Sequence, residues 1–166
     1  MSDAPGDGWP KFNIVRLSSG SDWDGAPVEL QVPEALIAFS YRAAESLTAM
    51  DGPTPRRFFK FGSTGLFGSL LFDSKTGSVV QHQEGARGVS LVSTSIAAFN
   101  EIVKKVIETF PFYSTSEDGD EMEVAAAKVK EIVCSEDPEA YFAGGFWETF
   151  VSDIEMGDYS TEEVIG

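Results

Sequence analysis

Residues 60–80, KFGSTGLFGSLLFDSKTGSVV, decide the fold of this chain. Gly62, Gly65 and Gly68 recur at every third position, a spacing that suits either a phosphate-binding loop or a series of turns. A phosphate loop leads directly into a helix, whose N-terminus attracts the anion. Here the glycines lead into Leu70–Phe72, a strand pattern, and the chain has no Gly-Lys-Ser/Thr motif. We therefore predict that Gly62 and Gly65 turn one hairpin and that Gly68 marks a bulge or a close backbone approach.

The segments around this stretch predict an antiparallel sheet. Asp73–Gly77 supplies the next turn, with Gly77 at a position that needs a positive φ. The flanking segments are short and rich in aromatic or β-branched residues, and Gly-containing turns separate them. Connections this short join antiparallel strands. The predicted strands are Arg57–Phe61, Leu66–Phe72, Ser78–Gln83 and Gly88–Val92.

The residues before the sheet predict strands and one helix. Phe12–Arg16 is a candidate strand within residues 1–25, a Gly-, Ser- and Asp-rich segment that we expect to be loosely structured. Apolar and polar residues alternate over 28–32, which predicts a half-buried strand or an extended arm. Pro33 then opens a helical spacing that ends at Asp51–Pro53. The apolar positions of this predicted helix are Leu36, Ile37, Tyr41, Ala44 and Leu47.

The residues after the sheet predict helices. Ser93, Thr94 and Ser95 supply an N-cap, and apolar residues then recur at helical steps from Ile96 to Phe110. On the other side of this helix, Glu101 and Lys105 form an i,i+4 pair. A second helix follows with capping-box spacing at Asp120 and Glu123, and a third helical turn begins at Asp137-Pro138-Glu139. The last apolar stripe comprises Phe146, Trp147, Phe150, Val151 and Ile154, before Gly157.

Strands followed by helices predict an α+β fold in one domain, residues 1–166. The short connections predict three or four consecutive antiparallel strands within it. No apolar run approaches the roughly 20 residues of a membrane helix, and the N-terminus lacks a signal pattern, so we expect a cytoplasmic protein. Cys134 is the only cysteine, which excludes an intramolecular disulfide.

The net charge of −15 is concentrated at one end of the chain. Residues 117–166 hold 15 acidic and 2 basic side chains, and we describe them as an acidic helical part. This charge repels nucleic acid and anionic membranes and attracts cationic proteins, although acidic surfaces also serve solubility alone. The candidate partner-binding residues are Glu117, Asp118, Asp120, Glu121, Glu123, Trp147, Glu148, Asp153 and Glu155. Trp147 lies in an apolar stripe, which favours core packing over a role as a surface anchor.

No residue pattern predicts catalysis, a cofactor or a metal site. His82 is the only histidine and lies on a predicted strand without a G-x-S-x-G nucleophile motif, so we interpret it as a surface histidine. Cys134 follows a helical stripe and is most simply a small buried hydrophobe. No spacing singles out a pair of catalytic carboxylates. We therefore expect a protein that is not an enzyme.

Several segments resemble the SUKH superfamily of bacterial immunity proteins, most closely its fourth subfamily. They are LQVPEAL, FFKFGS, LLFDSKTGSVV, VSTSIAAFNEIV and GGFWETFVSDI, between about Leu30 and about Tyr159. Asp73, Thr76 and Gly77 match the family's hairpin, and Ser93 to Phe99 match its strand-to-helix junction. This chain has Val92-Ser93 where the family often has an asparagine beside the serine. Trp147 corresponds to an aromatic position of the family's terminal helix.

The resemblance implies an α+β fold with a central, mostly antiparallel sheet of about four to six strands backed by helices. It also implies a non-catalytic immunity protein that binds and neutralises a cognate bacterial toxin. The acidic charge suggests that this toxin is a basic nuclease or deaminase, blocked by steric and electrostatic occlusion. Other members of the superfamily are regulatory or scaffolding proteins, so a protein-binding scaffold without a toxin partner is the main alternative. Two further alternatives are a nucleic-acid mimic, which needs phosphate-like spacing of carboxylates, and an enzyme that uses His82 or Cys134.

Overall fold

The computed structural model describes residues 11–17, 28–36, 40–51, 57–110, 112 and 119–157. Within these ranges the chain forms seven strands, followed by three α-helices and one short 3₁₀ helix. The strands are β1 (Phe12–Leu17), β2 (Val28–Pro33), β3 (Arg42–Asp51), β4 (Arg57–Thr64), β5 (Gly68–Asp73), β6 (Val79–Gln83) and β7 (Ser90–Ser93). The helices are α1 (Ile96–Glu108), α2 (Gly119–Glu136), η1 (Pro138–Ala140) and α3 (Phe146–Glu155).

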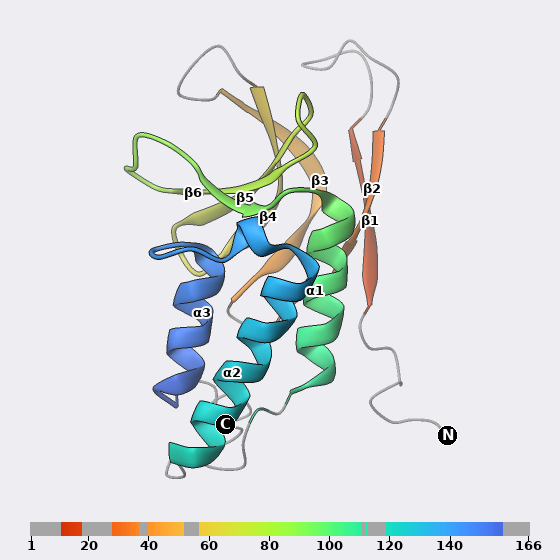
Figure 1. Ribbon diagram of the computed structural model, residues 1–166. Helices are drawn as coiled ribbons and strands as arrows, with labels where there is room; N and C mark the ends of the chain where they lie inside the picture. The colour runs from red at the N-terminus through yellow and green to blue at the C-terminus, as the bar shows by residue number, and fades with distance from the viewer. Residues whose placement is uncertain are drawn as a thin grey trace, which may run out of the picture.

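Five of these strands form one antiparallel sheet, in the order β3-β4-β5-β6-β7. Strands β1 and β2 pair separately as a second, two-stranded sheet. The three α-helices lie side by side, below the larger sheet in the view of Figure 1. The predicted α+β fold is therefore confirmed. The strands predicted at 12–16 and 28–32 are also confirmed, while the rest of the N-terminal segment, 1–10 and 18–25, lies outside the described residues.

The helix predicted from Pro33 to Asp51 is wrong. Pro33 ends β2, and the residues from Arg42 onward form strand β3. The pairing of β3 with β4 shifts between Ala43 and Thr48, so the side chains in between do not alternate strictly between two faces. In the sequence, Tyr41, Ala44 and Leu47 follow one another at three-residue steps, and this spacing imitates a helical stripe.

Two of the glycines in residues 60–80 are required by close packing. Gly62 lies inside β4, so the prediction that it turns a hairpin is wrong. Glycine is needed there because a Cβ atom would lie 2.5 Å from the Tyr41 ring. A Cβ atom on Gly68 would lie 2.1 Å from Thr64 Oγ1, which confirms the predicted close approach. Gly65 and Gly77 have φ angles of 58° and 81°, as expected for turn glycines.

The main core lies between the larger sheet and the helices. Tyr41, Phe61 and Phe99 meet edge to face, with ring centroids 5.4 to 6.3 Å apart. The Tyr41 hydroxyl donates to the Pro33 carbonyl at 2.9 Å, and its burial raises the pKa of this phenol. A smaller cluster of Phe58, Leu71 and Val80 is separate from this core.

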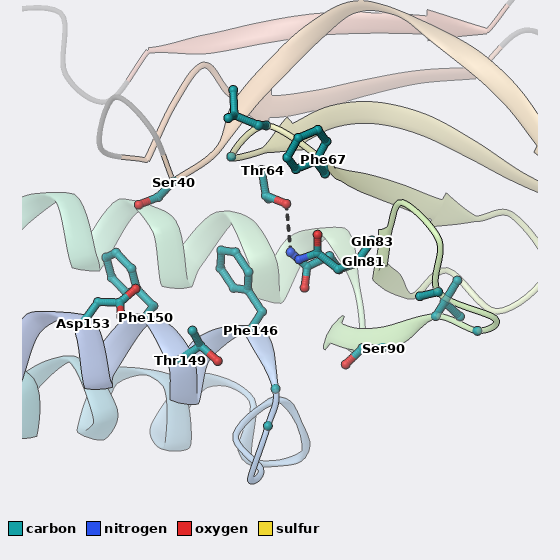
Figure 2. A pocket seen from close by; sticks show the side chains of 17 residues that line it. Ser40, Thr64, Phe67, Gln81, Gln83, Ser90, Phe146, Thr149, Phe150 and Asp153 are labelled. Atoms are coloured by element: carbon teal, nitrogen blue, oxygen red, sulfur yellow. Dashed lines mark hydrogen bonds between the residues drawn. The ribbon is translucent and has the colours of Figure 1, made fainter. Parts of the chain in front are cut away.

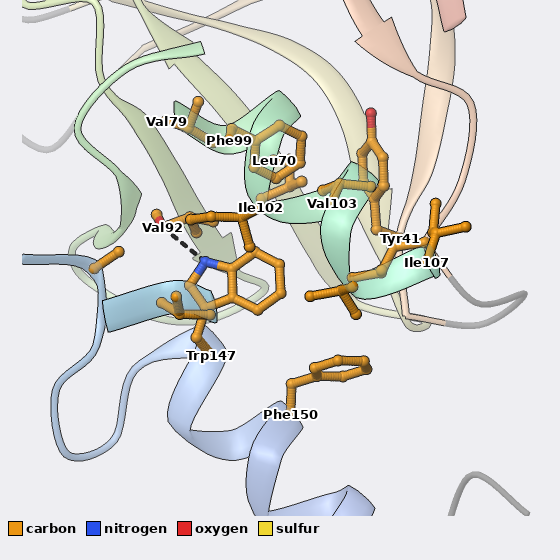
Figure 3. Close-up of a cluster of buried hydrophobic side chains, with 14 of the residues drawn as sticks. Tyr41, Leu70, Val79, Val92, Phe99, Ile102, Val103, Ile107, Trp147 and Phe150 are labelled. Carbon is orange, nitrogen blue, oxygen red and sulfur yellow. Dashed lines mark hydrogen bonds between the residues drawn. The ribbon is translucent and has the colours of Figure 1, made fainter. Parts of the chain in front are cut away.

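Two buried side chains attach the C-terminal helices to β7. The indole Nε1 of Trp147 donates to the Val92 carbonyl at 2.9 Å (Figure 3). Asp137 accepts from Ser93 Oγ and from the Thr94 backbone N–H, each at 2.7 Å, and also from Thr94 Oγ1. The carboxylate of Asp137 therefore holds the junction between β7 and α1, where Ser95 caps the helix as predicted.

The predicted helices are otherwise confirmed, with three local differences. Asp120 lies in the first turn of α2 and not at its N-cap position. Lys105 donates a hydrogen bond to Glu136 of α2 and not to Glu101, the predicted i,i+4 partner, which contributes only electrostatic attraction. Cys134 is exposed on α2, so its interpretation as a buried residue is wrong.

Candidate partner-binding surface

The predicted acidic residues divide among three places. Glu117 and Asp118 lie outside the described residues. Asp120 and Glu121 lie in the first turn of α2, where the helix dipole favours them. The others face two different depressions of the surface. Those facing the first are Glu123, Glu148 and Glu155, and Asp153 faces the second.

The first depression is a groove of about 310 Å³ between α2 and α3, which we call the acidic groove. Three of the predicted carboxylates line it from two successive α-helices, Glu123 from α2 and Glu148 and Glu155 from α3. Lys130 is the one basic residue among those that line it. The lining residues are Glu123, Ala126, Ala127, Lys130, Tyr141, Glu148, Val151, Ser152 and Glu155. The lining thus combines three carboxylates with the short apolar side chains of Ala126, Ala127 and Val151, which suits a long cationic side chain.

Tyr141 gives the acidic groove a hydroxyl group in addition to its carboxylates. Partial burial raises the pKa of Tyr141, and the negative charges of Glu148 and Glu155 raise it further. A tyrosine phenol is protonated at neutral pH even without this shift, so the Tyr141 hydroxyl is able to donate a hydrogen bond. The Lys130 ammonium lies over the Tyr141 ring, 5.3 Å from its centre, and makes a cation–π contact with it.

Trp147 does not contribute to this surface. Its side chain is completely buried against Val92 and Phe150 (Figure 3), so the candidate role as a surface anchor is wrong. The core-packing interpretation of the apolar stripe holds instead. Its neighbour Glu148 accepts from the Gly144 backbone N–H at 3.3 Å and so also supports the start of α3.

The second depression, which we call the large cavity, has a volume of about 630 Å³ and was not predicted. Figure 2 shows side chains from β4, β6, β7 and the adjoining turns facing those of α3 across it. The polar residues include Thr64, Gln81, Gln83, Ser90 and Thr149, and Gln81 Nε2 donates to Thr64 Oγ1 at 2.8 Å. Asp153 is the one charged residue among those that line it.

The rim of the large cavity carries exposed apolar side chains. Leu66 and Phe67 occupy the turn between β4 and β5, and they are 90% and 63% exposed. Both residues belong to the predicted strand Leu66–Phe72, which begins only at Gly68 in the structure, so this part of the prediction is wrong. The missed signal is the run Gly65-Leu66-Phe67-Gly68, because two large apolar residues between turn glycines have no core to enter.

The residues considered for catalysis lie elsewhere. His82 is on β6, where its Nε2 lies 3.0 Å from the Ala86 carbonyl oxygen, and it lines neither depression. Cys134 also lines neither. Among the described residues, no group of three or more His, Cys, Asp or Glu side chains is placed to hold a metal ion. None of the described helices is both long and apolar enough to cross a membrane.

Comparison with protein families gave one match. The family model described as SUKH-4 immunity protein matches residues 24–153. This range includes most of the described strands and helices, every residue that lines the large cavity, and all residues of the acidic groove except Glu155. Comparisons with curated proteins and with solved structures gave no significant match.

Proposed function

The chain belongs to the SUKH-4 immunity protein family, and we propose that it binds and neutralises a cognate protein toxin. The family match over residues 24–153 is the observation that carries this proposal. The protein acts in the cytoplasm without catalysing a reaction and without a cofactor. It covers the active site or substrate path of the toxin, and the toxin regains activity only when the complex dissociates.

The charge of the chain supports a basic toxin, such as a nuclease or deaminase. Enzymes that act on nucleic acid present cationic surfaces to phosphates. The acidic groove offers Glu123, Glu148 and Glu155 to such a surface, and Asp153 adds charge on the other side of α3. The proposed contact residues also include Asp120 and Glu121 in the first turn of α2, and Glu117 and Asp118, which precede this helix in the sequence.

These carboxylates act more on recognition than on raw affinity. An exposed ion pair contributes only about 0–1 kcal/mol, because water screens it and because both side chains lose freedom. Charge complementarity accelerates the encounter and excludes partners of the wrong sign. Binding by a surface of this kind weakens as salt is added.

Isothermal titration calorimetry with the toxin-domain protein encoded beside this gene tests the proposal. We expect 1:1 binding, and we expect the triple variant Glu123→Gln, Glu148→Gln, Glu155→Gln to lose about tenfold in affinity, from about 0.5 kcal/mol per carboxylate. The control variant Glu101→Gln, Glu131→Gln, Glu139→Gln has the same net charge and removes three exposed carboxylates that do not line the acidic groove. It should bind within about twofold of the unmodified chain.

Absence of binding to this toxin would refute the proposal. Binding to a different protein of the same cell, with none to the toxin, would favour a regulatory scaffold. Equal losses in the two triple variants would show that only the net charge matters and that the acidic groove is not the contact.

A further inference from the structure

Helix α3 forms a wall of both depressions. Phe146, Thr149 and Asp153 face the large cavity, whereas Glu148 and Glu155 face the acidic groove. These sets follow the helical repeat, because positions three or four residues apart share one side of a helix. A helix with its side chains is about 10 Å wide, so one partner segment that lies across α3 reaches into both depressions.

The chemistry of the large cavity suits an uncharged, largely apolar group. Leu66 and Phe67 stand exposed at its rim, and Phe146 and Val89 contribute further apolar surface. The remaining polar side chains are neutral, apart from Asp153. No basic residue is among the described residues that line this cavity, and the carboxylate of Asp153 disfavours an anion there. Its volume lies within the usual range of pockets that take a bound group.

We propose that α3 is the centre of a two-part interface for a basic protein. An apolar side chain of the partner enters the large cavity beside Leu66 and Phe67, and a neighbouring Lys or Arg lies in the acidic groove. Charge complementarity selects this occupant, because carboxylates line both sides of α3. The apolar contact supplies the slow dissociation that exposed ion pairs do not provide. This inference rests on the proposed function and identifies the surface that performs it.

The affinity of the double variant Leu66→Ala, Phe67→Ala for the same toxin tests this interface. Both side chains are exposed in a turn, so the variant should fold normally, with a Tm close to that of the unmodified chain. We expect the dissociation constant to rise by about tenfold or more, mainly through faster dissociation. Val124→Ala is the matched control, because Val124 is 68% exposed and lines neither depression. It should change the affinity by less than about twofold.

A second variant tests the large cavity from the side of α3. Thr149→Arg adds bulk and positive charge to an exposed position that lines this cavity, so it should weaken toxin binding while α3 remains folded. Unchanged affinity in both the Leu66/Phe67 variant and Thr149→Arg, with weaker binding in the acidic-groove triple variant, would overturn this inference and leave the proposed function intact. No binding by the unmodified chain would overturn both.

Discussion

Asp137 joins parts of the chain that are 44 residues apart in sequence. Its buried carboxylate accepts hydrogen bonds from Ser93 and Thr94, at the point where the last strand turns into α1. In the sequence, Asp137 and Ser93 are recognisable only separately, as the starts of two helical segments. Their pairing was not predictable, because single-sequence patterns report local spacing and not which distant groups meet.

Asp137→Ala should destabilise the fold by about 2–4 kcal/mol, because it leaves the buried Ser93 hydroxyl and the Thr94 N–H without their acceptor. Urea unfolding measures this loss. The nearby Glu139→Ala removes an exposed carboxylate and should change the free energy of unfolding by less than about 0.5 kcal/mol. An Asp137→Ala variant as stable as the Glu139→Ala control would contradict the role given to Asp137.

Gly62→Ala should cost about 1–3 kcal/mol, because the new methyl group would collide with the Tyr41 ring and with the Arg42 carbonyl. Gly88→Ala is the control, since a Cβ atom at Gly88 meets nothing within 4 Å. Thermal unfolding of the two variants compares them directly. If Gly62→Ala were as stable as Gly88→Ala, the close approach of β4 to Tyr41 would be wrong.

At the scale of the elements, regular segments were predictable and irregular ones were not. The existence of strands β4–β7 and of helices α1 and α3 was predictable, because turn glycines or cap residues flank them. The turn between β4 and β5 was misplaced, because it begins at Gly65 and includes Leu66 and Phe67. Strand β3 was missed because its shifted pairing with β4 breaks the alternation on which the strand pattern depends. The cavity was missed for a related reason, because its walls come from separate turns and from α3.

The contact between α1 and α2 includes an ion pair whose effect depends on pH. Lys105 donates to Glu136, and this hydrogen bond, with the negative charges of Glu136, Glu101 and Glu108, raises the pKa of Lys105 above 10.5. A lysine whose pKa is higher in the folded state stabilises that state fully at pH values below its unfolded pKa. This stabilisation is lost as the pH rises through the pKa of the folded state. The side chain is largely exposed to water, so the effect is small.

Lys105→Met should therefore lower the Tm slightly at pH 8, and the difference from the unmodified chain should shrink above about pH 10.5. Lys104→Met, at an exposed neighbouring position, should show little difference at either pH. Thermal melts across this range provide the measurement. A Tm difference for Lys105→Met that stays constant or grows above pH 10.5 would be inconsistent with the ion pair.

At the scale of the whole molecule, the sequence predicted the character of the surface better than its shape. The excess of carboxylates after residue 116 was evident from composition, and three of them do gather in the acidic groove. Their assembly depends on how α2 packs against α3, which composition does not reveal. Trp147 shows the same limit, because its apolar stripe favoured a place in the core, but only its burial in the structure decides between the core and an interface.

The central claim is that this protein neutralises a toxin by occupying it, which requires one molecule of the protein for each toxin molecule. Titrating the chain into a fixed amount of the cognate toxin, and measuring the residual toxin activity, tests this claim most directly. We predict a linear fall in toxin activity to zero at one equivalent, retained in His82→Ala and Cys134→Ala. Complete loss of toxin activity far below one equivalent, or no loss in excess protein, would contradict the account.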